Sequence, residues 1–316
     1  MENVDRFPNN ILRPTNIYIN NREYDLYKAN FRSITDLYHY VKSNPIINDS
    51  CFPILASERE SFDFAGEPYD TAVESIVKPV KEEYADFIKL QRKLDSFGTD
   101  FVTQYVTCKS ISGSVIDIPS YVSGSPLCYV SEKETYEPKF IRLNVLLSYY
   151  WGTSKNQVKN RALIITALIN ALEKEGYYVD INAFAISKEG DEIIDINVNL
   201  KNSNNTLNKS NIIKALCYVE FFRRVVFRVK ETMPVKDCEW GDGYGSTCEE
   251  SFSRKVLKIS KDDLFIDQPR ELGIWGKDLI LDFENAIEYL KLDNKINVKE
   301  SKKEIETEIK KLSLRR

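Results

Sequence analysis

The chain has 316 residues, a formal net charge of −4, and 42% hydrophobic and 29% charged residues. This composition is typical of a globular protein with a substantial core, and it excludes a globally basic surface for nucleic acid. No apolar run approaches the ~20 residues of a membrane-spanning helix, and Met1–Asn10 is too polar for a secretory signal. The irregular spacing of the six cysteines predicts reduced thiols. We therefore expect a cytoplasmic protein, inside its host cell, that is neither secreted nor inserted in a membrane.

Hydrophobic periodicity divides the chain into three parts. Residues 1–100 are predicted to form a mainly helical N-terminal region, and residues 101–292 an α/β core domain. The helices predicted in the first part are Ile34–Val41, Asp70–Val77 and Lys81–Phe97. Residues 293–316 form a charged tail with apolar residues at helical spacing, and we expect it to order as a helix only against a partner or a second copy.

The stretch from Phe140 to Leu200 has the strongest pattern in the chain. Phe140–Leu147 is mostly apolar, as in a strand that is buried on both faces. Ser154 stands three residues before a glutamine, which is the spacing of a capping box at the start of a helix, and Gly176 suits its end. The extended segments predicted after this helix are Tyr178–Ile186 and Ile194–Leu200.

Two topologies fit this order of strand, helix, strand and hairpin. One is a three-layer, mostly parallel sheet with helices on both faces. The other is an α+β ferredoxin-like core, a split βαβ unit with Leu264–Ile266 as its fourth strand. The apolar run Leu143–Leu147 favours the three-layer sheet, because strands of parallel sheets are covered on both sides.

Elsewhere, the sequence predicts a strand at Phe101–Thr107, a helical turn at Asp117–Gly124 and a helix at Leu279–Leu290.

The same stretch resembles the start of a von Willebrand factor A-type domain: a buried strand, a Ser-rich turn, a helix that carries Arg161, and a hairpin. In that family the first strand ends in Asp-x-Ser-x-Ser, whose oxygens hold a divalent cation. The corresponding positions here are Ser148, Thr153 and Ser154, and the aspartate of the motif is missing. Because a hard cation prefers carboxylate oxygens, the resemblance implies the fold without a tight Mg²⁺ or Ca²⁺ site. We expect no metal and no cofactor.

A second resemblance covers more of the chain. Its blocks are Phe62–Ala72, Ile118–Pro126, Arg161–Ile164 and Leu172–Val179, which are similar to an uncharacterised family of proteins from phages and other mobile elements. This resemblance implies a viral or mobile-element context and assigns no chemistry.

Histidine and cysteine chemistry find little support in the sequence. His39 is the single histidine, so a catalytic triad or a histidine-based metal cluster lacks its partners. Cys238 and Cys248 lack the close paired spacing of zinc ligands. The glycine-rich segment between them is interpreted as a plain surface loop or as a loop for a partner or ligand, with Trp240, Asp242 and Tyr244 as the contact residues.

Residues 209–230 are predicted to form one long helix that interleaves aromatic residues with cations. Such a pattern suits single-stranded nucleic acid. The candidate contacts to nucleic acid are Arg223, Arg224, Arg228 and Lys230. In the alternative interpretation the helix is simply amphipathic, with Phe222 facing the core and Arg224 and Arg228 on a solvated side.

These observations favour a non-enzymatic binding or assembly protein of a phage or mobile element. We expect a protein partner or self-association, with nucleic acid as a further candidate partner. The alternative is a metal-dependent nucleic-acid-processing enzyme that uses Asp and Glu carboxylates, because such chemistry needs no histidine. Three acidic side chains that converge in one cleft would favour the enzyme, whereas a broad apolar or basic face would favour binding.

Overall fold

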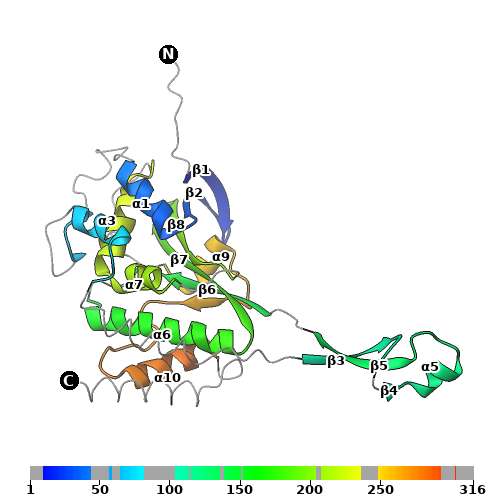
Figure 1. Cartoon of the computed structure of the whole chain (residues 1–316). Helices are drawn as coiled ribbons and strands as arrows, with labels where there is room; N and C mark the ends of the chain where they lie inside the picture. Colours follow the sequence, from blue (N-terminus) through cyan, green and yellow to red (C-terminus); the bar gives the residue numbers. More distant parts are fainter. Residues whose placement is uncertain are drawn as a thin grey trace.

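The computed structural model describes residues 10–43, 57–58, 65–81, 104–113, 115–135, 139–150, 152–203, 208–235, 248–292 and 303. Six strands form one sheet, in the spatial order β1 (Ile11–Ile19), β2 (Arg22–Phe31), β8 (Glu192–Lys201), β7 (Tyr177–Glu189), β6 (Lys139–Leu146) and β9 (Leu264–Ile266) (Figure 1). The pairings β2–β8, β6–β7 and β6–β9 are parallel, and the pairings β1–β2 and β7–β8 are antiparallel. The fold is therefore α/β with a mixed sheet.

Most of the described helices surround this sheet, and one of them, α5 (Ile118–Val122), lies beside a second, smaller sheet. They are α1 (Ile34–Ser43), α3 (Tyr69–Val77), α5, α6 (Lys155–Lys174), α7 (Lys209–Cys217), the π-helix η2 (Phe221–Val226), α8 (Phe227–Glu231), α9 (Glu250–Leu257) and α10 (Leu279–Leu290). The small sheet has the order β3 (Gln104–Ser110), β5 (Tyr129–Thr135), β4 (Val115–Ile116). No helix in the described ranges is long and apolar enough to cross a membrane.

Strand β6 lies inside the large sheet, between β7 and β9, as its apolar sequence predicts. Leu143 and Val145 are fully buried on one face, and Leu146 is fully buried on the other. Because β6 pairs directly with β7, nothing is inserted between the two strands of this βαβ unit. The ferredoxin-like alternative, which needs a split unit, is therefore wrong.

Helix α6 connects β6 to β7 and begins where the capping box predicts. The Ser154 hydroxyl accepts a hydrogen bond from the Gln157 amide at 3.3 Å, and the Gln157 side chain accepts one from the Ser154 amide at 2.9 Å. These contacts pair two amide groups that the first turn of a helix leaves without partners. At the other end, Gly176 has φ +80°, a left-handed conformation that glycine adopts without a steric penalty.

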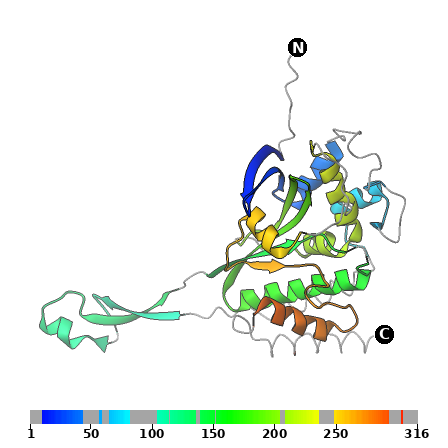
Figure 2. The same cartoon turned by 180° about the vertical axis from the view of Figure 1, so that it is seen from behind.

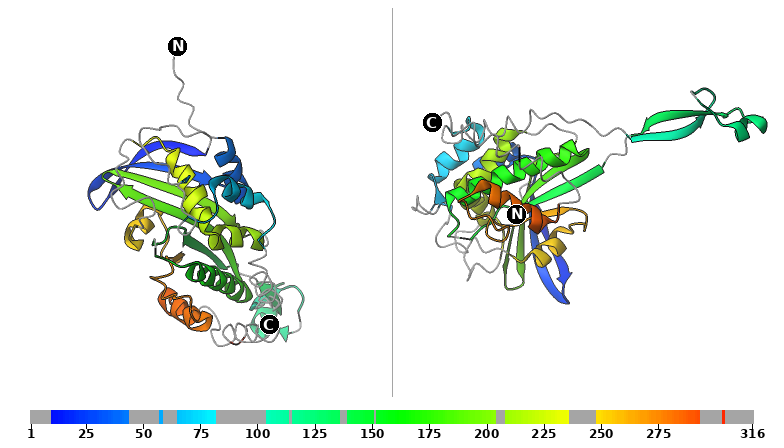
Figure 3. Two further views of the ribbon diagram at one scale, coloured as in Figure 1. Left: turned by 90° about the vertical axis from the view of Figure 1, so that its left-hand side faces the viewer. Right: turned by 90° about the horizontal axis from the view of Figure 1, so that it is seen from below.

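The two faces of the large sheet are covered unequally. The main hydrophobic core joins one face to α1, α3, α6, α7, η2 and α10. A smaller cluster on the other face packs Val256 and Phe252 of α9 against Leu26, Phe184 and Phe265. Helices thus lie on both faces, but a single described helix covers the second one (Figure 3).

The predicted long helix over residues 209–230 is interrupted, so this prediction is wrong. Helix α7 ends at Cys217, and Tyr218 has an extended backbone with ψ 116°. The chain then continues as η2, which has six residues, and α8. A π-helix is rare and needs support from its surroundings. Part of that support is Tyr218, whose hydroxyl accepts a hydrogen bond from the Lys81 amide at 2.8 Å.

The N-terminal region differs from the prediction, because residues 11–31 form β1 and β2 of the large sheet. Strand β2 pairs with β8, from Asp25 opposite Glu192 to Phe31 opposite Val198. Residues 1–100 are therefore not a separate helical unit. The predicted helices over α1, α3 and α10 are confirmed. The predicted helix over residues 81–97 and the tail 293–316 lie outside the described residues, apart from Lys81 and Lys303.

The small sheet stands apart from this body. Strands β3, β4 and β5 with helix α5 form a narrow projection, which we call the arm (residues 104–135, apart from Ser114). Figures 1 and 2 show the arm extending away from the large sheet and its helices, and the view from below in Figure 3 shows the same. Its far end, which we call the arm tip, consists of residues 111–113 and 115–127 with β4 and α5.

Candidate functional site

The arm tip carries a concentration of exposed apolar side chains. Each of them has between 46% and 79% of its surface exposed. They are Ile111, Val115, Ile116, Ile118, Tyr121, Val122 and Leu127. Single exposed hydrophobic residues are normal on a protein surface, but such a concentration on one projection indicates a surface for interaction.

Local hydrogen bonds fix the shape of the arm tip. Pro119 lies in the first turn of α5, where its missing N–H is harmless, and the Ser123 amide donates to the Pro119 carbonyl at the other end. Gly124 follows with φ +72° and lets the chain turn back, so that the Ser125 amide donates to the Ser120 carbonyl at 3.0 Å. The apolar side chains are therefore presented by an ordered turn of helix.

The arm tip is close to electrically neutral. Asp117 forms an ion pair with Lys109 at 2.6 Å, and this pair holds the pKa of the Asp117 carboxyl below its usual value, with help from the Ser120 hydroxyl. Asp117 is the single charged residue between residues 110 and 131. The surface thus lacks the free cations with which proteins bind nucleic acid or anionic lipid.

Ser120 lies close to Lys109, and a lysine beside a serine can activate the serine hydroxyl as a nucleophile. The Lys109 Nζ atom is 2.6 Å from the Ser120 hydroxyl oxygen, a distance that a Ser–Lys nucleophile pair also has. A lysine activates serine only when its amine loses the proton, which requires burial or a neighbouring cation. Lys109 is instead 60% exposed and forms an ion pair with the Asp117 carboxylate. The contact stabilises the turn.

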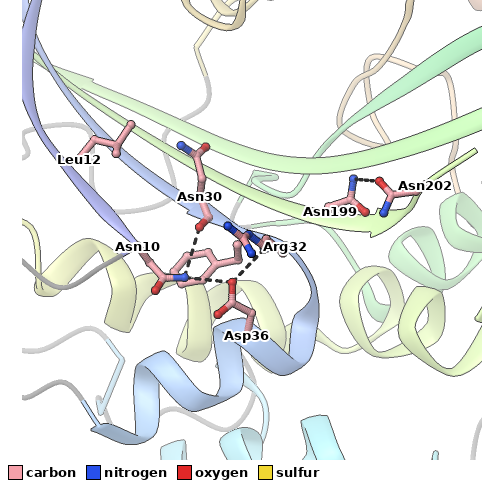
Figure 4. A pocket seen from close by; sticks show the side chains of 8 residues that line it. Asn10, Leu12, Asn30, Arg32, Asp36, Asn199 and Asn202 are labelled. Carbon is pink, nitrogen blue, oxygen red and sulfur yellow. Dashed lines mark hydrogen bonds between the residues drawn. The ribbon is translucent and has the colours of Figure 1, made fainter.

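A second candidate site lies on the body, at the carboxyl ends of the adjacent parallel strands β2 and β8. Here the structure has a pocket of about 720 Å³, which we call the amide pocket. Its polar lining consists of Asn10, Asn30, Arg32, Asp36, Asn199 and Asn202, and its apolar lining of Leu12 and Phe31 (Figure 4). Ligands of α/β proteins commonly bind beyond the carboxyl ends of parallel strands, and this volume lies in the range of small-molecule sites.

Hydrogen bonds hold one wall of the amide pocket in place. The Asp36 carboxylate accepts hydrogen bonds from the Asn10 side chain and the Arg32 amide, both at 3.0 Å. The Asn10 side chain also donates to the Asn30 carbonyl. On the opposite wall, the Asn199 side chain donates to Asn202 at 3.0 Å. Figure 4 shows these two groups of side chains on either side of the pocket.

Two of the three positions of the degenerate cation motif, Thr153 and Ser154, form hydrogen bonds within the fold. The Ser154 hydroxyl caps α6, and the Thr153 amide donates to the Tyr150 carbonyl at 3.0 Å. Ser148 is buried, and its hydroxyl has no hydrogen-bond partner among the described residues.

The buried guanidinium of Arg161 donates to the Leu146 and Asp267 carbonyls at 2.9 and 3.1 Å. A fixed positive charge therefore lies at the carboxyl ends of β6 and β9.

The four cations proposed as nucleic-acid contacts are buried, so the expectation of a solvated face at Arg224 and Arg228 is wrong. The exposed fractions of Arg223, Arg224, Arg228 and Lys230 lie between 2% and 8%. Burial lowers the pKa of Lys230 to about 7. Since stacking on single-stranded nucleic acid needs open side chains, these residues serve the interior instead.

The buried cations connect residues 57–58 and 67–69 to η2 and α8. The Arg224 guanidinium donates to the Glu67 and Ser57 carbonyls, both at 3.0 Å. The Arg228 guanidinium forms an ion pair with Glu58 and lies 4.1 Å from the centre of the Tyr69 ring. This role of Arg224 and Arg228 could not be predicted from the sequence, because their partners are more than 150 residues away in the chain.

Neither metal chemistry nor the other predicted sites gain support from the described residues. Within them, no three His, Cys, Asp or Glu side chains converge to hold a metal ion. His39 is exposed and contacts the ring of Tyr38. The proposed partner loop, with Trp240, Asp242 and Tyr244, lies outside the described residues, as does Cys238.

Comparison with known proteins places the chain in a family. Residues 13–294 match the model of DUF7192, a domain of unknown function. The chain belongs to the DUF7192 family. The matched range of DUF7192 includes the large sheet from the third residue of β1 onward, the lining of the amide pocket apart from Asn10 and Leu12, and the whole arm. No curated protein and no solved structure matches the chain.

The turn of helix in the arm is predicted from the sequence, but its exposure is not. The run from Ser110 to Leu127 mixes apolar residues with Ser, Gly and Pro and contains one charge. It follows neither the period of two of a half-buried strand nor a helical period beyond α5. An apolar segment without a periodic buried face is the signal that could have indicated an exposed contact surface.

Proposed function

We propose that this DUF7192 protein is a non-enzymatic binding or assembly protein, and that the arm tip is its contact with a partner protein. The observation that carries the proposal is the concentration of seven exposed apolar side chains on a projection. An arm of this kind reaches beyond the body of its own chain, so its tip can enter a groove on another molecule. In line with the sequence resemblance, the proposed context is a phage or another mobile element.

The physical basis of the contact is the hydrophobic effect. Fully burying one aliphatic or aromatic side chain is worth about 1.5–3 kcal/mol, so a few of the seven would supply a substantial part of a binding free energy. Part of that gain is offset by the lost freedom of the two partners on association. The ordered turn around α5 keeps the additional cost of ordering small.

The chemistry of the arm tip favours a protein partner over nucleic acid or membrane. Binding to nucleic acid depends on free Lys and Arg side chains, and peripheral binding to anionic lipid depends on them as well. The one cation beside the tip, Lys109, is already paired with Asp117. A neutral apolar surface with interspersed hydroxyls suits an apolar groove on a protein that lacks strong charge.

The fold lends support to the proposed likeness to a von Willebrand factor A-type domain. Strand β6, helix α6 and the β7–β8 hairpin follow one another in the order on which that resemblance rests. The likeness remains a proposal about ancestry and fold. The buried guanidinium of Arg161 beside the degenerate motif supports the further expectation that this unit works without a bound cation.

A comparison of capture by two variants tests the proposal. The full chain would be expressed with an affinity tag in its native host cell, as wild type, as the double variant Ile118→Ser/Val122→Ser, and as the control Tyr18→Ser. Tyr18 is 72% exposed on β1 and thus matches the exposure of the arm residues. We expect one protein to co-purify in stoichiometric amounts with the wild type and the control, and at least tenfold less with the arm variant.

Self-association is tested with the same three proteins by light scattering after size-exclusion chromatography. If the partner is a second copy, the mass of the wild type exceeds the 36.6 kDa of one chain and the arm variant returns to it. Equal capture and equal mass for the arm variant and the wild type would contradict the proposal. The alternative function, a carboxylate-based nucleic-acid-processing enzyme, has no observation in its favour among the described residues.

A further inference from the structure

The amide pocket lies on the body, apart from the arm, and has a distinct chemical character. Four of its six polar side chains are carboxamides, from Asn10, Asn30, Asn199 and Asn202. The other two are Arg32 and Asp36, whose formal charges cancel. A carboxamide offers both a donor and an acceptor and carries no charge. The pocket thus presents many groups that offer both a donor and an acceptor, and its lining has no net formal charge.

Much of this hydrogen-bonding capacity is not consumed by the fold. The Asn10 side chain and one oxygen of Asp36 are used to hold the wall. Asn30 contributes its backbone amide and carbonyl to the hydrogen bonds found within the described residues, and its exposed side chain, which forms none of them, lines the pocket. Asn202 accepts through its oxygen, which leaves its amide nitrogen to face the pocket. Free donors and acceptors therefore remain on both walls.

The polar surface continues from the pocket across the second face of the large sheet. Side chains alternate between the faces of a strand, and Ile193 of β8 and Phe184 of β7 belong to the cluster on that second face. Asn197 and Asn182, at even spacing from these residues, share the face. The Asn182 side chain donates to Asn197 at 3.0 Å, and Asn197 donates to Asp195 at 2.6 Å.

We call Asn182 and Asn197 the asparagine row, and the charged groups next to it are balanced. Asp195 is buried and forms an ion pair with Lys28 on the neighbouring strand, at 2.9 Å. Asn30 and Asn197 are direct partners in the β2–β8 register, so the row connects to the wall of the pocket. An elongated ligand that fills the pocket would therefore find further neutral hydrogen-bonding groups along the sheet.

We infer that the amide pocket and the adjoining asparagine row bind a short neutral oligosaccharide. Sugar hydroxyls both donate and accept hydrogen bonds, as carboxamides do, so the two arrays are complementary. The pocket of about 720 Å³ is larger than an ion or a single amino acid needs. Leu12, which is half exposed, supplies an apolar patch for the C–H face of a sugar ring.

Other ligand classes fit the pocket less well. Nucleic acid binds to surfaces with free positive charge, and here the negative charge of Asp36 balances the positive charge of Arg32. Nucleobases are held by stacking on open aromatic rings, but the aromatic side chain in the lining, Phe31, is buried in the main core. An extended peptide would pair with the backbone of the edge strand β1 and would make little use of Asn199 and Asn202.

Nuclear magnetic resonance on the full ¹⁵N-labelled chain tests this inference through the side-chain amide signals of Asn30, Asn199 and Asn202. The probes are maltotriose, cellotriose and N,N′,N″-triacetylchitotriose, each at about 10 mM, which detects even millimolar affinity. An oligothymidylate and an uncharged tetraserine peptide serve as the competing classes. We expect at least one trisaccharide to shift the three pairs of amide signals in a saturable way.

Matched variants connect the binding to the pocket. Asn30→Ala and Asn199→Ala should each weaken binding of that trisaccharide about tenfold, the loss expected for one or two neutral hydrogen bonds. Asn16→Ala removes an exposed asparagine on β1, bonded to Glu23, and should leave the affinity unchanged. Asn30 is exposed, so its truncation leaves folding intact even where that of Asn199 does not.

Three results would overturn the inference. The first is that no trisaccharide shifts the pocket signals. The second is that the oligothymidylate or the peptide shifts them at lower concentration than every saccharide. The third is that both pocket variants bind like the wild type. None of these results bears on the arm, whose proposed role is tested by partner capture alone.

Discussion

At the end of β9, burial raises the pKa of the Asp267 carboxyl to about 6, although the hydrogen bond from the Gln268 amide pulls it down. In the unfolded chain an aspartate has a pKa of about 3.9. Between about pH 4 and pH 6 the folded state therefore holds a proton that the unfolded state has lost, and stability falls as the pH rises. Above about pH 6 the full cost is present, on the order of 2–3 kcal/mol.

Asp267→Asn should remove this cost. The asparagine oxygen can still accept the Gln268 amide, and the Asp267 carbonyl that binds Arg161 belongs to the backbone and is unchanged. We predict that the variant melts at a higher temperature than the wild type at about pH 8 and at the same temperature at about pH 4. Thermal unfolding across this range measures the difference. A constant offset between the two proteins at every pH would show that burial of the charge is not its cause.

Ser148 and Ser154 provide a matched pair, because both occupy positions of the degenerate cation motif. Ser148→Ala removes a buried hydroxyl that has no hydrogen-bond partner among the described residues. It should leave the free energy of unfolding unchanged or raise it by up to about 1 kcal/mol. Ser154→Ala removes the cap of α6 and should destabilise by about 1 kcal/mol. Denaturant titrations with and without millimolar Mg²⁺ measure both. A cation site would reveal itself if Mg²⁺ stabilised the wild type and either variant abolished the effect.

At the scale of single elements, β6 is the strand on which the sheet depends. Val145→Asp would place a carboxylate in the main core, at a cost of several kcal/mol, and should give insoluble protein. Phe140→Asp is the matched control, since Phe140 is on the same strand but 65% exposed, and it should change stability by less than about 1 kcal/mol. Soluble yield and melting temperature compare the two. Normal behaviour of Val145→Asp would mean that β6 does not lie in the core.

Local signals explain which elements the sequence predicts. The capping box at Ser154, the glycine at residue 176 and the apolar run of β6 act within a few residues, so β6, α6, the β7–β8 hairpin, β9 and α10 could all be predicted. Strands β1 and β2 were missed because their turn uses Asn20 and Asn21, at φ +52° and +64°, instead of glycine. Asparagine tolerates this left-handed conformation, so the pair was a usable hairpin signal.

The break between α7 and η2 could not be predicted in the same way. Its causes are distant in the chain: the Lys81 amide at Tyr218, the Ser57 and Glu67 carbonyls at Arg224, and Glu58 at Arg228. The sequence 221–230 has the ordinary pattern of an amphipathic helix, and tertiary contacts override it. The same reasoning applies to the amide pocket, whose asparagines lie just before β1, in β2, and in and just after β8, and meet only when β2 pairs with β8.

At the scale of the whole molecule, the two candidate surfaces differ in position and in chemistry. The arm tip is apolar and projects from the body, whereas the amide pocket is polar and lies at the end of the sheet. A molecule with this division can hold a small neutral ligand on its body while its arm engages another protein. We therefore propose that this DUF7192 protein acts through contact between its arm and a partner protein.

Photo-crosslinking at the arm tip in the native host cell tests whether this contact forms. A benzophenone amino acid would replace Val122 on the arm tip or, in the control, Tyr18 on β1, two exposed positions of similar accessibility. If the arm tip is the contact surface, illumination gives a discrete covalent adduct from position 122 and little from position 18. Equal yields from both positions, or no adduct from position 122 while the protein is folded and abundant, would contradict it.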